Sequence, residues 1–313
     1  MATSLNNLAE LFRIQGEYPK AETYFKRSLD IREKALGVEH REVAQSLNNL
    51  GALYRALGQY EKAERFHKRA RAIREKVLDP GHPEIAESLN NLAVLYRAQG
   101  AYEKAEGLLQ RALSIDEEAL GMDHPGLATD IINLAGLYMR EGQYTKAEQL
   151  YKRGLTIDET AFGREHPAHA ADLNNLALLY ETQGQYGKAE PLYHRALVTL
   201  EKSLGPGHPD VATSLNNLAT FHWAQGQYAK AVESFTRAAA VSEHNVSLNL
   251  AVGAETQKRA YIMTLSGEMD GVLSVHLDAV PHSRKAARLA LVTLLQRKGR
   301  VLDALTGGME TLR

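Results

Sequence analysis

Arginine side chains recur at a fixed spacing of 42 residues near the start of this 313-residue sequence. Arg13, Arg55 and Arg97 lie 42 residues apart, and Arg140 follows one place late in the next interval. A guanidinium group presents a planar fork of donors that matches a carboxylate. The row therefore indicates a site for an acidic ligand, with a solvated charged surface as the alternative.

Histidines follow the same spacing and suggest a metal site at first sight. They are His40, His82, His124, His166 and His208. Each falls in a different copy of the same loop, and neither a cysteine nor a His–Glu pair at helical spacing accompanies them. We therefore expect them to cap helices or pack in loops, and we expect no metal and no cofactor.

Catalytic chemistry has little support in the sequence. There is no cysteine, which excludes disulfides, cysteine-ligated zinc and a cysteine nucleophile. GxSxG, phosphate-loop and dinucleotide motifs are also lacking. The sequence predicts that this chain is not an enzyme.

Composition narrows the classes of partner. The chain is 44% hydrophobic and 24% charged, with a formal net charge of −1, so it has no general attraction to nucleic acid. It contains no apolar run long enough to cross a membrane, and its first residues do not form a secretory signal. We expect a cytoplasmic protein with no nucleic-acid or membrane partner.

The spacing of 42 residues reflects an internal repeat. In the second copy, Leu47 and Leu50 share one face of a helix expected over residues 44–57. Gly58 is expected to end this helix, because glycine adopts the left-handed C-cap conformation at low cost. A second helix follows, expected over residues 60–78. Each copy is thus a helical hairpin.

Small residues and prolines recur at fixed places in the hairpins. The alanines of the second helix are Ala21, Ala63, Ala105, Ala147, Ala189 and Ala231. They predict close contact between the two helices of a hairpin. A His-Pro pair joins most copies, and its proline is expected to occupy the first turn of the next helix.

The expected domains follow from the copies. Six hairpins are expected over residues 2–43, 44–85, 86–127, 128–169, 170–211 and 212–242, and a C-terminal helical segment over residues 243–313. The sixth copy departs from the pattern after Ala238, where we expect it to lose the long end of its second helix. The fold class is all-α.

These leucine, alanine, glycine and tyrosine positions resemble the tetratricopeptide repeat, in the 42-residue form of kinesin light chains and many bacterial proteins. The resemblance covers about residues 2–242. It implies a right-handed superhelical solenoid in which the first helices of the hairpins, the A helices, line a concave groove that binds a protein or peptide. The second helices are the B helices.

The resemblance also assigns roles to the paired asparagines of the A helices. It places the first asparagine of each pair on the groove face, at Asn6, Asn48, Asn90, Asn174 and Asn216. Amides there would bind an extended backbone as both donor and acceptor, unless they are ordinary exposed polar residues. It gives the second asparagine a structural role between helices, at Asn49, Asn91, Asn133, Asn175 and Asn217.

The same groove face carries the arginine row and three apolar residues. Val94, Leu178 and Trp223 are positioned to accept a hydrophobic anchor. The ligand we expect is an acidic segment that contains an apolar or aromatic residue. The function indicated is that of a scaffold for protein–protein interaction.

Two other roles remain open at this point. Residues 294–304 resemble the connector of bacterial proteins that join such repeats to a caspase-like CHAT protease domain. This would make the chain a sensor or regulatory module for a protease encoded downstream. Alternatively, the array begins in register at Ala2 without a cap, so its exposed end is a candidate surface for self-association.

Overall fold

The chain, as a computed structural model, is described over residues 1–252. The C-terminal segment expected beyond residue 252 and its CHAT-like connector lie outside these described residues. The chain divides into two compact units, Met1–Ile157 and Asp158–Arg313. Each unit is considered by itself below.

Within residues 1–252 the fold is all-α, as predicted, and contains twelve α-helices and no strand. The first unit contains α1 (Ala2–Ile14), α2 (Tyr18–Leu36), α3 (Arg41–Ala56), α4 (Tyr60–Val77), α5 (Pro83–Ala98), α6 (Tyr102–Leu120), a short 3₁₀ helix (Pro125–Leu127) and α7 (Ala128–Arg140). Helix α8 (Tyr144–Phe162) crosses the boundary between the units. The second unit continues with α9 (Pro167–Thr182), α10 (Tyr186–Leu204), α11 (Pro209–Ala224) and α12 (Tyr228–Val252). None of the helices in residues 1–252 is both long and apolar enough to cross a membrane.

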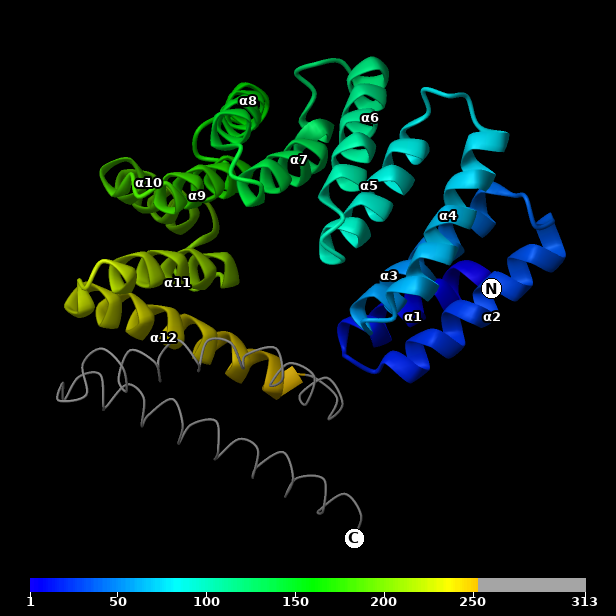
Figure 1. The fold of residues 1–313 in the computed structure, drawn as a ribbon. Helices are drawn as coiled ribbons and strands as arrows, with labels where there is room; N and C mark the ends of the chain where they lie inside the picture. Colours follow the sequence, from blue (N-terminus) through cyan, green and yellow to red (C-terminus); the bar gives the residue numbers. More distant parts are fainter. Residues whose placement is uncertain (253–313) are drawn as a thin grey trace, which may run out of the picture. The chain divides into compact units, whose positions relative to one another are not determined.

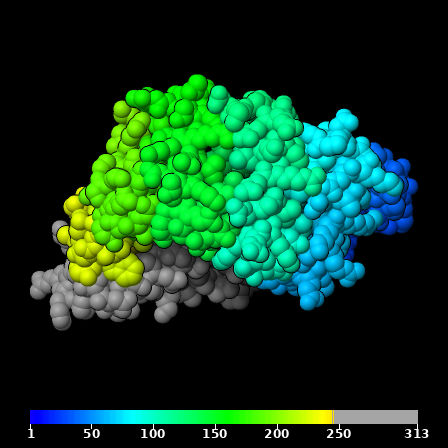
Figure 2. Space-filling model, turned by 45° about the horizontal axis from the view of Figure 1, so that its top comes forward, coloured from blue at the N-terminus to red at the C-terminus, as the bar shows by residue number. Residues whose placement is uncertain are grey.

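Consecutive helices pair as hairpins, visible in the first unit as α1/α2, α3/α4 and α5/α6 (Figure 1). Val43, Leu47 and Ile73 form a buried cluster between α3 and α4, to which Leu29 of the preceding hairpin adds. The next hairpin repeats this cluster 42 residues later, around Leu89. In Figure 2 the colours of successive hairpins in the first unit follow one another as adjacent bands of closely packed side chains.

The alanines at the close contact of each hairpin are fully buried. Ala63 and Ala105 have no exposed surface, and the equivalent alanines of the other copies also have none. A larger side chain would separate the two helices of a hairpin. The packing role predicted for these positions is confirmed.

The ends of the helices match their local sequence signals. Gly58 has a φ of 69° after α3, a left-handed conformation that glycine adopts without strain. At the other end of α3, the His40 Nδ1 atom accepts a hydrogen bond from the backbone N–H of Glu42 at 3.2 Å. The other four loop histidines cap their helices in the same way, at 3.0–3.2 Å. The capping role expected for these histidines is confirmed.

The sixth hairpin differs from expectation. Its B helix, α12, runs for 25 residues to Val252, whereas we expected it to be shortened and to end by residue 242. Other B helices stop at a glycine, such as Gly121 or Gly205. Between Tyr228 and Val252 there is neither glycine nor proline, so nothing in the sequence ends the helix there.

The polar residues that are buried between neighbouring hairpins differ from one repeat to the next. In the first unit, the buried Arg74 donates to the Ser88 Oγ atom at 2.9 Å. At the equivalent place further along, Asp116 faces Asp130, which is 1% exposed. The second unit has a similar pair, Asp158 and Asp172, each 4% exposed. Two carboxyl groups in such surroundings resist ionising together.

These acidic pairs predict an unusual dependence of stability on pH. Burial and the adjacent Asp130 raise the pKa of Asp116 to about 7, and burial and Asp158 raise the pKa of Asp172 to about 7. The folded chain therefore holds protons that the unfolded chain releases. This stabilisation is complete below about pH 4 and is lost as the pH rises to about 7.

We expect an Asp116→Asn/Asp172→Asn variant to be more stable than the parent at pH 8, by on the order of 1 kcal/mol, or about 2–4 °C in Tm. The difference should shrink at pH 5, where the parent carboxyls are protonated. Thermal unfolding followed by circular dichroism between pH 5 and pH 8 measures it. His67 titrates in the opposite sense, because burial lowers its pKa to about 4, but it is present in both proteins and cancels in the comparison. A gap between the two proteins that is the same at both pH values would contradict the assignment.

Candidate functional site

The four arginines predicted to bind a ligand all lie at the ends of A helices in the first unit, on α1, α3, α5 and α7. The first of them is neutralised. The Arg13 Nη2 and Nε atoms lie 2.5 Å and 2.9 Å from the two carboxylate oxygens of Glu10, one turn earlier in the same helix. Arg13 therefore already has a carboxylate partner within its own helix.

The other three arginines have no such partner in the part of the chain that the structure describes. No ion pair with a carboxylate is found for Arg55, Arg97 or Arg140 among the described residues. The place that Glu10 takes in the first copy is held by Ala52, Val94 and Gly136 in the next three, none of which carries charge. We call Arg55, Arg97 and Arg140 the cationic cluster.

Arg97 occupies the centre of the cationic cluster. Its Nη1 atom lies 3.6 Å from the position that a Cβ atom on Gly136 of α7 would take, and the Tyr151 hydroxyl lies 3.8 Å from it. Burial lowers the pKa of Arg97, and the neighbouring charges of Arg140 and Arg55 lower it further. Three like charges thus gather over α3, α5 and α7, and an anion there would relieve their mutual repulsion.

Two of the asparagines expected on the groove face, Asn48 and Asn90, are buried instead. Asn48 is 2% exposed: its Nδ2 atom donates to the Ser88 Oγ atom at 3.3 Å, and its Oδ1 atom lies 3.1 Å from the Nδ1 atom of His67. Asn90 is 9% exposed and donates to Asp130 of the next hairpin. Both were expected to line the groove, and this expectation is wrong because their amides tie neighbouring hairpins together.

The second asparagine of each pair is the more accessible one in the first unit. Asn91 and Asn133 are partly exposed and have no hydrogen-bond partner within the described residues. Asn49 is also partly exposed, but its Nδ2 atom donates to the Asn6 Oδ1 atom at 2.8 Å. The amides next to the cationic cluster that are free to bind a backbone are therefore those of Asn91 and Asn133.

Comparison with known proteins agrees with this repeat architecture. The sequence model of the tetratricopeptide repeat matches residues 1–76, 48–118, 127–197 and 173–244, which together make up most of the chain. The chain belongs to the tetratricopeptide repeat family. No curated protein matches this tetratricopeptide repeat protein.

Its repeats are similar to those of a kinesin light chain-like protein of known structure. Tetratricopeptide-like repeats of a putative kinesin light chain from Podosopora anserina are 28% identical, with a TM-score of 0.56, over 64% of this chain and 95% of that chain. BtubC from P. vanneervenii is 23% identical, with a TM-score of 0.57, over 74% and 90% of the two chains. A Rap protein complexed with Competence and Sporulation Factor is 16% identical, with a TM-score of 0.53, over 96% and 98%. The last two share the fold alone. The repeats and the kinesin light chain-like relative support a role as a protein-interaction scaffold.

The remaining predicted contact residues of this tetratricopeptide repeat protein lie in the second unit. They are Asn174, Leu178, Asn216 and Trp223. Leu178 is 44% exposed, and the other three are partly exposed. The arginine position is taken here by Glu181, which accepts a hydrogen bond from the Tyr193 hydroxyl at 2.7 Å. At the positions equivalent to Arg55 and Arg97, the described part of the second unit has Glu181 and Trp223 and no arginine.

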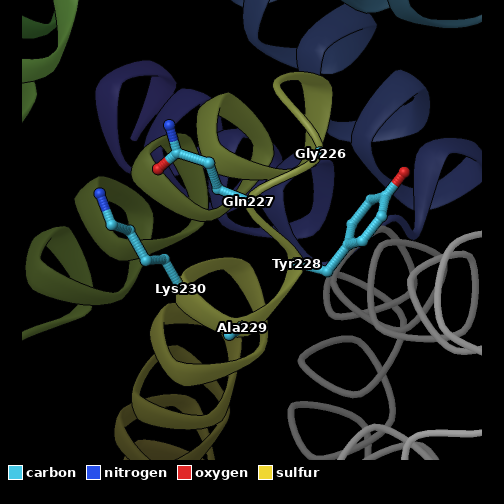
Figure 3. A pocket seen from close by; sticks show the side chains of 5 residues that line it. All are labelled: Gly226, Gln227, Tyr228, Ala229 and Lys230. Atoms are coloured by element: carbon cyan, nitrogen blue, oxygen red, sulfur yellow. The ribbon is translucent and has the colours of Figure 1, made fainter.

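A hollow at the turn between α11 and α12 is not suited to a small ligand. Its lining consists of five consecutive residues, Gly226 to Lys230. In Figure 3 the side chains of Gln227 and Lys230 extend to one side of the backbone and that of Tyr228 to the other. Polar groups that diverge in this way do not define a binding site for a small molecule.

One contributor to the cationic cluster was missed in the sequence. Gly136 leaves the space beside which the Arg97 guanidinium lies. The signal was the absence of a side chain where the neighbouring copies have Ala52, Val94 and Leu178. A Cβ atom at this position would be in ordinary van der Waals contact with the guanidinium and the Tyr151 hydroxyl.

Proposed function

We propose that this tetratricopeptide repeat protein is a scaffold that binds an acidic peptide segment at the cationic cluster of its first unit. The observation that carries the proposal is that Arg55, Arg97 and Arg140 have no carboxylate partner among residues 1–252, in contrast to the paired Arg13. A cluster of like charges on neighbouring helices is costly unless an anion neutralises it. Carboxylates of a bound segment would supply that neutralisation.

The surroundings of the cluster support an extended chain with an apolar residue. Val94, partly exposed, lies one turn before Arg97 on α5. Asn91 lies one turn earlier again, so an amide, an apolar side chain and a guanidinium follow one another along the helix. Asn91 is placed to hydrogen-bond a peptide backbone, Val94 to contact an aliphatic or aromatic side chain, and Arg97 to bind a carboxylate.

The relatives are consistent with a binding role. The Rap protein of the same fold is described in complex with Competence and Sporulation Factor. That partner belongs to the Rap protein. For the present chain, the chemistry of the ligand is inferred from the cationic cluster alone.

A pair of peptides of equal length tests the proposal. One contains three Asp or Glu residues around a Leu or Phe, and the other replaces each acid by its amide. Fluorescence anisotropy at low salt should give a Kd on the order of micromolar for the acidic peptide, which corresponds to about −8 kcal/mol. The amide peptide should bind about tenfold or more weakly, and added salt should narrow the gap. Equal affinity for the two peptides would refute a site for carboxylates.

The other two roles stay predictions. The connector-like residues 294–304 lie outside the described residues, so a regulatory role beside a CHAT protease rests on the sequence resemblance. Self-association rests on the first hairpin, where Leu11 is 44% and Ile14 64% exposed on α1. Light scattering as a function of concentration tests the second of these roles.

A further inference from the structure

A contact between a carboxylate, an ammonium group and a phenol recurs where successive hairpins meet in the first unit. Glu22 on α2 pairs with the Lys26 Nζ atom at 2.5 Å and accepts a hydrogen bond from the Tyr54 hydroxyl at 2.7 Å. The next hairpin repeats it with Glu64, the Lys68 Nζ atom at 2.7 Å and the Tyr96 hydroxyl at 2.9 Å. Each residue of the second set lies 42 places after its equivalent in the first.

The equivalent contact in the second unit has two histidines instead. Glu190 is retained on α10, but His194 replaces the lysine and His222 of α11 replaces the tyrosine. The Glu190 Oε1 atom lies 3.4 Å from the His222 Nε2 atom and 4.0 Å from the His194 Nε2 atom. One ligand atom from each of the three lies within 4.8 Å of the others. Both residues that differ are histidines, whose imidazole nitrogens can bind a metal ion, and both lie at the same contact.

This arrangement has the features of an open metal site. Two imidazoles and a carboxylate are a ligand set that binds zinc and leaves a fourth position for water. His222 is 2% exposed, and its buried Nδ1 atom has no hydrogen-bond partner within residues 1–252. The side chain of His194 is 53% exposed and is free to shorten the distances to those of coordination.

One positive charge lies at the same place. The Nζ atom of Lys230 on α12 is 3.1 Å from the Glu190 Oε1 atom, and Figure 3 shows its side chain extending away from the α11–α12 turn. The Lys230 side chain is 55% exposed, so it can leave the carboxylate at little cost. A bound metal cation would displace the Lys230 ammonium group and bind the Glu190 carboxylate in its place.

We propose that Glu190, His194 and His222 bind a divalent transition-metal ion of the zinc type. The site joins α10 to α11 and so would fix the contact between the last two hairpins in the described part of the chain. It is distinct from the loop histidines, whose Nδ1 atoms cap helices. It is independent of the acidic-peptide site, which lies in the other unit.

The test is isothermal titration of the full chain with Zn²⁺ at pH 7.5, compared with a His194→Lys/His222→Tyr variant. This variant introduces the side chains found at the first two equivalent contacts, Lys26 with Tyr54 and Lys68 with Tyr96, so we expect it to keep its helical content and Tm. The parent should bind one equivalent that the variant lacks. Substitution with Co²⁺ should give the visible absorption of a low-symmetry, nitrogen-ligated ion in the parent only.

Two further variants make the result specific. Lys230→Gln removes the competing ammonium and should tighten Zn²⁺ binding by roughly threefold to tenfold. His166→Asn keeps a capping side chain and should leave binding unchanged. The proposal is overturned if the His194→Lys/His222→Tyr variant, folded by circular dichroism, binds Zn²⁺ with the same stoichiometry and affinity as the parent.

Discussion

Reversing two charges of the cationic cluster, in an Arg55→Glu/Arg97→Glu variant, is expected to weaken binding of the acidic peptide by about thirtyfold or more, or about 2 kcal/mol. The change removes the attraction between guanidinium and ligand carboxylate and adds repulsion between two carboxylates, and both effects weaken binding. Both side chains are partly exposed and lack an ion pair within the described residues. Folding should therefore be affected much less than binding. Fluorescence anisotropy with the peptide pair described above measures the loss.

A matched variant separates a local site from a general effect of charge. Arg27 and Arg65 are exposed arginines on the B helices α2 and α4 of the same unit. An Arg27→Glu/Arg65→Glu variant has the same net charge as the Arg55→Glu/Arg97→Glu variant, and we expect it to bind the peptide within about threefold of the parent. Similar losses in both variants would show that the peptide responds to the overall charge and not to the cationic cluster.

The largest loss of stability is expected for Arg74→Ala, at about 3–5 kcal/mol. Arg74 has no exposed surface. Its Nη1 atom donates to the Glu84 carbonyl at 2.7 Å, and its Nη2 atom donates to the Gln45 Oε1 atom at 2.8 Å. It also ion-pairs with Glu87 at 3.0 Å. Alanine would leave a cavity and buried acceptors without donors where α4 meets α5.

Thermal or urea unfolding measures this loss, with two controls. Arg69→Ala removes the exposed ion pair with Glu33 and should cost less than about 1 kcal/mol. Arg74→Leu should fall between the two alanine variants, because the chain already places Leu200 at the equivalent position. There, the opposing Ser214 Oγ atom is buried and has no hydrogen-bond partner among the described residues. If Arg74→Ala cost no more than Arg69→Ala, the buried network would not stabilise the joint.

The hairpins could be predicted from the sequence because the determinants of each hairpin are local. Gly58 ends one helix, His82-Pro83 begins another, and Ala105 allows the two helices of a hairpin to approach. Each signal acts within a few residues and recurs in the other copies. The predicted start of α3 at Ala44 was late by three residues, because the capping role of His40 was not used to place it.

The roles of the two asparagines could not be predicted in the same way. Neighbouring residues on a helix point about 100° apart, so choosing between Asn48 and Asn49 requires the position of the next hairpin. That position depends on partners about one repeat away, such as Ser88 for Asn48 and Asp130 for Asn90. The family resemblance put Asn48 and Asn90, which are buried, on the groove face.

The free charge of the cationic cluster was partly visible in the sequence. Glu10 lies one turn before Arg13, whereas Ala52 and Val94 precede Arg55 and Arg97 at the same distance. The comparison between copies therefore shows which arginines lack a neighbour of opposite charge on their own helix. Only the structure shows that no carboxylate of another hairpin in the described residues reaches them, because that depends on how the helices pack.

A charge swap tests the binding account most directly. The Arg97→Glu variant is titrated with the acidic peptide and with a peptide in which one acidic residue is replaced by lysine, and the parent is titrated with both. If Arg97 contacts that residue, the lysine peptide should bind the variant more tightly than the acidic peptide does, by about fivefold or more, while the parent shows the reverse order. The account is contradicted if no position of the lysine in the peptide reverses the order of affinities.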